Sequence, residues 1–232
     1  MQYISVPQVR LVTRPSINWA AIADFLDSEG LPPIPDSIRS GDDESSAVVE
    51  ISARLCYMSY GRGRKDISDF INNLLSKGDG SVFEHVNYGF VISGISRSLT
   101  HELVRHRAGF AYSQRSQRYV DESESDFIIP PALNENDPKT IKAADVMKAA
   151  MESSLSSYKN LVSELDKIIP EEQFESLSDR RKAIRQAARS VLPNATETKI
   201  LLQQMFVLGD ISLKCVELHL LIGKLEILQL LF

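Results

Sequence analysis

Cysteine is scarce in this sequence, which contains only Cys56 and Cys215 in 232 residues. The two lie far apart and neither belongs to a Cys-x-x-Cys pair, which excludes a disulfide framework and a structural zinc site, and we expect no bound metal. Long apolar runs are also missing, and the first ten residues have no secretion signal. We therefore expect a cytoplasmic protein that does not bind a membrane.

An excess of positive charge is absent too. The net charge is −5 at pH 7, so the chain as a whole does not attract nucleic acid or anionic membranes. Any site for an anion must therefore be a local cluster of basic residues. The hydrophobic fraction of 43% and the charged fraction of 25% are typical of a globular protein.

The residue patterns predict a single α+β domain. Strands are expected over 9–13 and 83–93, and in the second range aromatic and β-branched residues alternate with the rest, as in a strand with one buried face. Helices are predicted over 17–26, 45–58, 67–75, 141–169 and 179–191, and Ser96 is expected to cap a helix that ends near Arg107. In the helix 45–58, Ser45 is the expected N-cap and Cys56 the expected core residue.

A basic segment runs from His101 to Tyr119. Four arginines occur within fourteen residues and alternate with aromatic residues. Guanidinium groups bind phosphates through paired, charge-assisted hydrogen bonds, and aromatic rings can stack on a flat ligand. The segment therefore suits a phosphorylated ligand that contains a ring.

Two other interpretations of this segment are open at this point. The arginines could form ordinary ion pairs on a solvated surface. The alternation of arginine and aromatic residues is also typical of proteins that bind single-stranded nucleic acid, although the acidic balance of the chain disfavours that function.

Four motifs together identify a resemblance. They are Arg105-His106-Arg107 followed by Tyr112-Ser113-Gln114 and Ser116-Gln117-Arg118-Tyr119; Ser81-Val82-Phe83-Glu84-His85; Ser96-Arg97 with Thr100-His101-Glu102-Leu103-Val104; and Ala188-Arg189-Ser190-Val191-Leu192-Pro193. In this combination the sequence resembles the flavin-dependent thymidylate synthases over residues 8 to 200. The chain differs from the usual family pattern by one extra residue before Ser116 and by Asp79 where a histidine is common.

The resemblance implies an α+β fold with a central sheet flanked by helices, in a homotetramer whose sites are shared between subunits. It implies that FAD, NADPH and methylenetetrahydrofolate are used to convert dUMP to dTMP without an enzyme cysteine. Neither cysteine has an activating histidine or cation beside it in the sequence, which agrees with that chemistry.

The resemblance also implies site residues. Those for FAD are Ser81, Glu84, Arg105, His106, Arg107 and Gln114. Those for dUMP are Glu102, Leu103, Val104, Arg105, Gln114, Arg115, Ser116, Gln117, Arg118 and Arg189, with Arg189 contributed by another subunit.

The tail after residue 200 departs from the family. From Ile200 to Phe232 there are eleven leucines in 33 residues and no arginine, where the family has an Asn-x-Arg element, an arginine that contacts uracil, and Glu-Ile-Arg. Shifted by one nucleotide, the codons of Gln203 to Leu218 permit a run containing Asn-Val-Arg-Ser-Trp-Arg-Tyr-Phe-Ile-Glu-Met-Arg, and those from Leu221 onward permit Asp-Trp-Glu-Ile-Arg. We therefore predict a synthase domain over 1–200 and a frameshifted, leucine-rich tail over 201–232.

Three alternatives remain from the sequence. The chain could be a non-catalytic remnant that binds at most flavin or nucleotide. It could belong to a homologue that methylates UMP instead of dUMP. The tail could also be a divergent helix that packs at a subunit interface or binds a partner.

Overall fold

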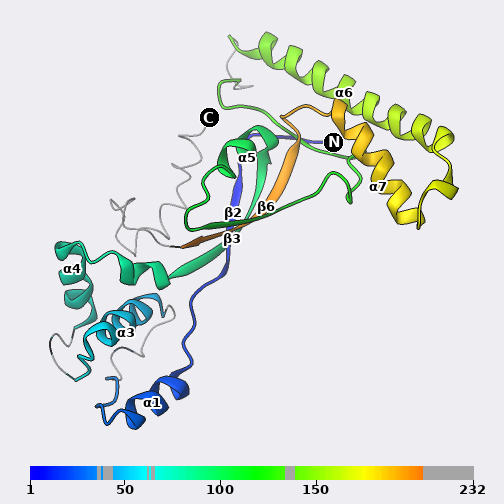
Figure 1. Ribbon diagram of the computed structural model, residues 1–232. Helices are drawn as coiled ribbons and strands as arrows, with labels where there is room; N and C mark the ends of the chain where they lie inside the picture. The colour runs from blue at the N-terminus through cyan, green and yellow to red at the C-terminus, as the bar shows by residue number, and fades with distance from the viewer. Residues whose placement is uncertain (36–37, 39–43, 62, 64–65, 134–138, 206–232) are drawn as a thin grey trace.

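The computed structural model describes residues 1–35, 38, 44–61, 63, 66–133 and 139–205. A sheet runs through the middle of the elongated molecule, with one group of helices at each end (Figure 1). This arrangement confirms the predicted α+β class with a central sheet flanked by helices.

The central sheet has four antiparallel strands in the order β2-β3-β6-β4. Their bounds are β2, Gln8–Thr13; β3, Asn87–Ser96; β6, Glu197–Met205; and β4, Phe110–Gln114. A separate parallel pair joins β1 (Tyr3–Ile4) to β5 (Phe127–Ile128). The strands predicted over 9–13 and 83–93 are present, although the first three residues of the second range belong to the 3₁₀ helix η1 (Ser81–His85).

The buried face of β3 follows the predicted alternation. Val86, Tyr88, Phe90 and Ile92 are all buried, because successive side chains of a strand point to opposite faces. Ile200 and Leu202 of β6 join the same core. The last five described residues, 201–205, are therefore an integral part of the sheet.

The first group of helices covers one end of the sheet. It consists of α1 (Trp19–Ser28), α3 (Ser45–Tyr57), α4 (Ile67–Lys77) and η1. Helix α4 begins at Asp66, whose carboxylate accepts the Asp69 amide at 2.9 Å, and it ends at Gly78 in the left-handed conformation.

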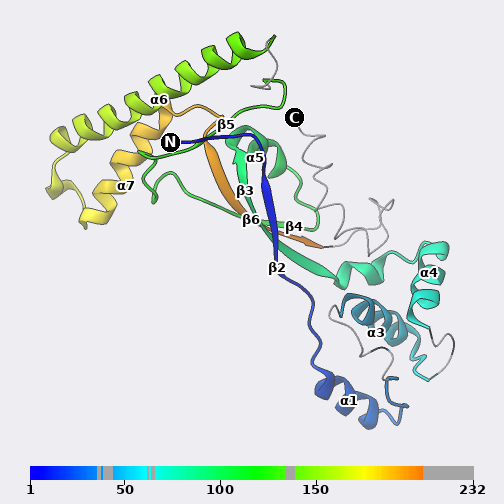
Figure 2. The same cartoon turned by 180° about the vertical axis from the view of Figure 1, so that it is seen from behind.

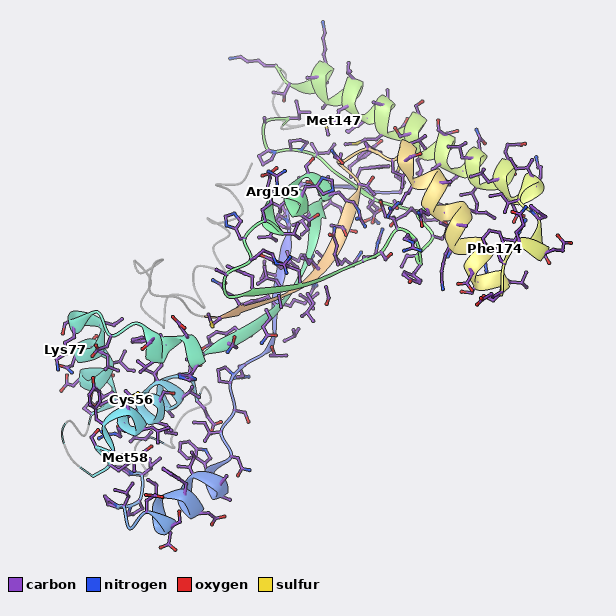
Figure 3. All side chains as sticks on the ribbon, in the orientation of Figure 1. Cys56, Met58, Lys77, Arg105, Met147 and Phe174 are labelled. Atoms are coloured by element: carbon purple, nitrogen blue, oxygen red, sulfur yellow. The ribbon has the colours of Figure 1, made fainter. Side chains whose placement is uncertain are left out.

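Two expectations about α3 are wrong. Ser45 is its first helical residue and not its cap, since its hydroxyl is 2.5 Å from the Tyr88 hydroxyl. Cys56 is exposed, not in the core. The buried side of α3 contains Ala47, Val49 and Ala53 together with Glu50 and Arg54, which form a buried ion pair at 2.5 Å. Figure 3 shows Cys56 near the end of this helix and Met58 just beyond it, at one end of the molecule.

The second group of helices covers the other end. Helix α6 (Ile141–Ile168) lies against α7 (Leu177–Ala188), with the short 3₁₀ helices η2 (Glu171–Gln173) and η3 (Arg189–Val191) before and after α7. Arg180 of α7 anchors the connection between the two helices, since its side chain binds Asp166 at 2.6 Å and the Ile169 carbonyl at 2.9 Å. Figure 2 shows this pair from behind, on the far side of the sheet from α1, α3 and α4.

We expect Phe83→Ala to lower the free energy of unfolding by about 3–5 kcal/mol. Phe83 in η1 is fully buried in the core that α3 and α4 share with the sheet, and its loss leaves a cavity there. Urea unfolding of both proteins measures the difference. As a control, Val146→Ala on α6, where the side chain is 72% exposed, should change the stability by less than about 0.5 kcal/mol. Equal effects would contradict the assigned core.

Candidate active site

The basic segment follows a short helix, α5 (Arg97–Leu103). The Ser96 hydroxyl caps this helix by accepting the Leu99 amide at 3.1 Å, which confirms the predicted cap. The helix ends at Leu103, four residues earlier than predicted. Downstream, the Tyr112 hydroxyl lies 3.0 Å from the Leu103 carbonyl and 2.8 Å from the His106 carbonyl. Burial raises the pKa of the Tyr112 phenol, so the hydroxyl remains a proton donor that holds this turn.

Arg105, His106 and Arg107 lie on that turn and are exposed. Arg105 forms an ion pair with Glu102 at 3.3 Å, in which both side chains are more than half exposed, and such pairs contribute little stability. Figure 3 shows Arg105 beside α5. The three basic side chains are therefore accessible to an anionic ligand.

The other residues implied for flavin lie on η1, before β3, where Ser81 and Glu84 are exposed. The turn with Arg105–Arg107 leads into β4, whose first residue, Phe110, pairs with Gln204, and Gln204 pairs with Tyr88 near the start of β3. The chain therefore returns after α5 toward the η1 end of the sheet.

A cavity of 630 Å³ adjoins the η1 end of the sheet. Its lining includes Arg14, Ser52, His85, Asn87 and Gln203, and of these His85 and Asn87 lie close to Ser81 and Glu84 in the sequence. No motif in the sequence pointed to Arg14 or Gln203, because they come from opposite ends of the chain and meet only through the sheet.

A second cavity, of 520 Å³, lies between α5 and the end of α7. We call it the arginine cavity and define it by Arg97, His101, Gln117, Gln186 and Arg189. Two of these, Gln117 and Arg189, were predicted to bind the nucleotide. The structure brings them together within one chain, whereas the resemblance implied that Arg189 comes from another subunit. Its lining also includes Ser190, Leu192, Pro193 and Asn194, and contains no acidic residue.

Arg97 and His101 also line the arginine cavity, although no role was predicted for either of them. They lie four residues apart on α5, which places both on one face of the helix, and Arg97 belongs to a motif of the resemblance. The Arg97 guanidinium donates to the Arg115 carbonyl at 2.6 Å. Burial, with repulsion from Arg115 and Arg189, lowers the pKa of Arg97, and Glu122 opposes that shift. Positively charged guanidinium groups that repel one another are therefore held close together at this cavity.

Arg115 is engaged with protein groups. Its guanidinium is 2.5 Å from Glu122 and 3.6 Å from Glu197, two carboxylates that are almost fully buried. Its amide donates to the Lys199 carbonyl of β6 at 2.9 Å. The structure therefore places Arg115 behind the arginine cavity and not among its lining residues.

The remaining predicted residues separate into buried and exposed groups. The Gln114 side-chain amide donates to the hydroxyls of Thr100 at 2.9 Å and Thr198 at 3.2 Å. The Ser116 hydroxyl accepts the Arg118 amide at 3.2 Å, and the Arg118 side chain is exposed, 5.9 Å from the centre of the Tyr119 ring. Leu103 and Val104 are half-buried against the core, and Glu102 is exposed.

Metal centres and membrane-spanning helices are two other kinds of functional feature. In the described ranges, no three His, Cys, Asp or Glu side chains gather as they would around a metal ion. No helix in the described part of the chain has the length and apolar character needed to cross a membrane.

The fold is α+β, and one of its cavities is lined by arginines and glutamines and by no acidic residue, an arrangement suited to a small anionic ligand. The particular family follows from comparison. Residues 39–204 match the family described as thymidylate synthase complementing protein. The chain belongs to this family, and its enzyme class is that of the flavin-dependent thymidylate synthases.

The relatives support the same class. The chain is 40% identical over 187 residues to the flavin-dependent thymidylate synthase of Mycobacterium avium (strain 104), which covers 79% of this chain and 70% of the relative. It is 42% identical over 170 residues to that of Mycobacteroides abscessus, covering 72% of this chain and 65% of the relative.

A solved structure supports the fold. The UMP/dUMP methylase PolB from Streptomyces cacaoi, bound with 5-Br UMP, has a TM-score of 0.56 and 19% identity over 88% of this chain and 74% of that one. At this identity the likeness shows the fold alone.

Proposed function

We propose that this fold serves the FAD-dependent methylation of dUMP to dTMP, with methylenetetrahydrofolate and NADPH as co-substrates, and that the arginine cavity receives the nucleotide. The observation that supports this most is the convergence of Arg97 and Arg189 in a cavity with no acidic lining residue. A phosphate dianion between the two guanidinium groups would relieve their repulsion through paired, charge-assisted hydrogen bonds.

Neutral donors and acceptors complete the proposed nucleotide site. Gln117 and Gln186 each offer an amide with a donor and an acceptor, the two functions needed to pair with the edge of a uracil ring. Cations beside the ring would favour its ionised form, which makes its C5 carbon more nucleophilic. We propose that Glu102, Leu103 and Val104 border this site and that Ser116 and Arg118 meet the nucleotide phosphate.

The described residues fit a flavin near the η1 end of the sheet. Arg105, His106 and Arg107 are exposed basic residues suited to its phosphates, and Ser81 and Glu84 are exposed on η1. The family resemblance supports sites shared between subunits, and we therefore propose a homotetramer. The flavin, when bound, supplies the redox chemistry, while the protein binds and orients the reactants.

We propose that the chain as written has lost the end of this site through a frameshift. The match to the family ends at residue 204, and the described chain follows the sheet to Met205. The predicted leucine-rich tail from residue 206 onward lies outside the described residues. The hidden-frame pattern of family residues across those codons supports the proposal, and resequencing of the gene tests it directly.

The proposed reaction is tested with a frame-restored protein. We expect dUMP to trigger oxidation of NADPH in the presence of methylenetetrahydrofolate and to be converted to dTMP, which chromatography detects. The same assay with UMP distinguishes the alternative substrate. Absence of turnover with both nucleotides, in a yellow protein with the absorbance of bound flavin, would contradict the proposed function.

We expect Arg118→Ala, in the frame-restored protein, to weaken dUMP binding by about 1.5–3 kcal/mol and to leave FAD binding nearly unchanged. Arg118 follows Ser116 in the segment that we assign to the nucleotide phosphate, and its side chain is exposed. Calorimetric titration with each ligand measures both affinities. Equal losses for FAD and dUMP would contradict this assignment.

A further inference from the structure

A buried carboxylate stands behind the arginine cavity. Glu122 is fully buried, and one of its carboxylate oxygens accepts the Ser125 hydroxyl and lies 2.5 Å from the Arg115 guanidinium. The Glu122 amide donates to the Tyr158 hydroxyl of α6 at 3.3 Å. Glu122 is therefore attached to the helical pair as well as to the basic segment.

Arg115 connects Glu122 to the arginine cavity. Its side chain lies between Glu122 and Glu197, its amide is bound to β6, and its carbonyl accepts the Arg97 guanidinium at 2.6 Å. The position of the Arg97 side chain in the cavity thus depends on where the Arg115 backbone is held. One bond to a carbonyl leaves other N–H groups of the planar guanidinium for a ligand.

Stability alone does not account for this arrangement. A buried ion pair commonly contributes little net stability, because removing two charges from water is costly. Here the second Glu122 oxygen and the Nε atoms of Arg97 and Arg115 are buried without a hydrogen-bond partner within the described part of the chain, which adds to that cost. A network that costs stability is explained if it positions a side chain for ligand binding.

We propose that Glu122 is a positioning residue for nucleotide binding: through Arg115 it holds the Arg97 guanidinium where the phosphate enters the arginine cavity. The proposal rests on the proposed function, in which a nucleotide phosphate occupies that cavity. A purely electrostatic role would have the opposite effect on affinity, since removing a negative charge near the cavity strengthens its attraction for an anion. The sign of the change in affinity therefore distinguishes the two roles.

The test uses Glu122→Gln, which keeps the size of the side chain and removes its charge. We expect calorimetry to show dUMP affinity reduced by about tenfold, as for a weakened charge-assisted hydrogen bond, with a smaller change for deoxyuridine, which lacks the phosphate. In parallel, phenylglyoxal labelling followed by mass spectrometry measures the reactivity of Arg97, which should rise several-fold once the side chain is released. The matched control is Glu124→Gln, since Glu124 is 79% exposed and pairs with Lys159 at the surface.

Each outcome decides the proposal. Unchanged or tighter dUMP binding, together with unchanged labelling of Arg97, would overturn it. If the unmodified protein binds no dUMP, the proposed function fails, and the labelling of Arg97 still decides whether Glu122 positions it. If thermal melting shows that Glu122→Gln does not fold, Ser125→Ala, which removes one hydrogen bond to the same carboxylate, is measured in the same two ways and should change both in the same direction by less.

Discussion

The 232-residue chain as written is expected to form no dTMP, whereas a protein with the reading frame restored near codon 200 is expected to turn over. By the family resemblance, the arginine that contacts uracil would be encoded across Cys215 and Val216. The flavin-side Asn and Arg would be encoded across Gln204–Met205 and Phe206–Val207. An apolar side chain cannot donate a hydrogen bond to a uracil carbonyl, and the loss of one such donor reduces the rate by about 10²–10³-fold.

The measurement compares the two proteins for dUMP-dependent oxidation of NADPH and for dTMP formation. Binding of dUMP to the arginine cavity is the internal control, because Arg97, Gln117 and Arg189 are present in both chains. Size-exclusion chromatography checks that both have the same oligomeric state. Equal turnover by the two proteins would show that the frameshift hypothesis is wrong and that the tail is a divergent solution.

Local patterns predicted the elements that depend on neighbouring residues. The alternation in β3 and the Ser96 cap of α5 are both present, since each is determined within a few residues. Strands β4 and β6 were not predicted. Strand β6 is recognisable only because it pairs with β3 and β4, and β4 only because it pairs with β6. These pairings, such as Tyr112 with Leu202, join distant parts of the chain.

The same distinction applies to α3. Helical spacing puts Leu55 and Met58 on one apolar face with Val48 and Ile51, yet Leu55 and Met58 are 48% and 44% exposed. The buried side instead includes Glu50 and Arg54, whose ion pair the pattern of apolar residues does not reveal. Cys56 is exposed because it lies outside this buried side.

For the site, the motifs indicated the right segment but not the role of each residue in it. Gln114, Arg115 and Gln117 are close in sequence, yet they contact buried threonines, buried carboxylates and the arginine cavity, respectively. These roles depend on the pairing of β4 with β6 and on the position of α7, neither of which is encoded locally. The same contacts bring Arg97 and Arg189 together, although 92 positions separate them in the sequence.

We expect Arg189→Met to weaken dUMP binding by about 10–100-fold, the loss of a charge-assisted contact to phosphate. Without ligand, the same substitution should leave the protein as stable or slightly more stable. Repulsion from Arg189 is one of the causes that lower the pKa of Arg97, so removing Arg189 relieves a cost that the free protein bears. Methionine keeps an unbranched chain of similar reach, which limits the change in packing.

The two effects are measured by calorimetric titration with dUMP and by urea unfolding of the free protein. Arg181→Met is the matched control, since Arg181 is exposed on α7, the helix directly before η3, donates to the Leu177 carbonyl at 3.3 Å and does not line the arginine cavity. It should leave dUMP affinity unchanged. A loss of stability at Arg189→Met that matches its loss of affinity would show that this arginine supports the fold. If Arg189 is held in place for a ligand, its loss should weaken binding while the stability of the free protein stays unchanged or rises. The reason is that its favourable partner, the phosphate, is absent until the nucleotide binds.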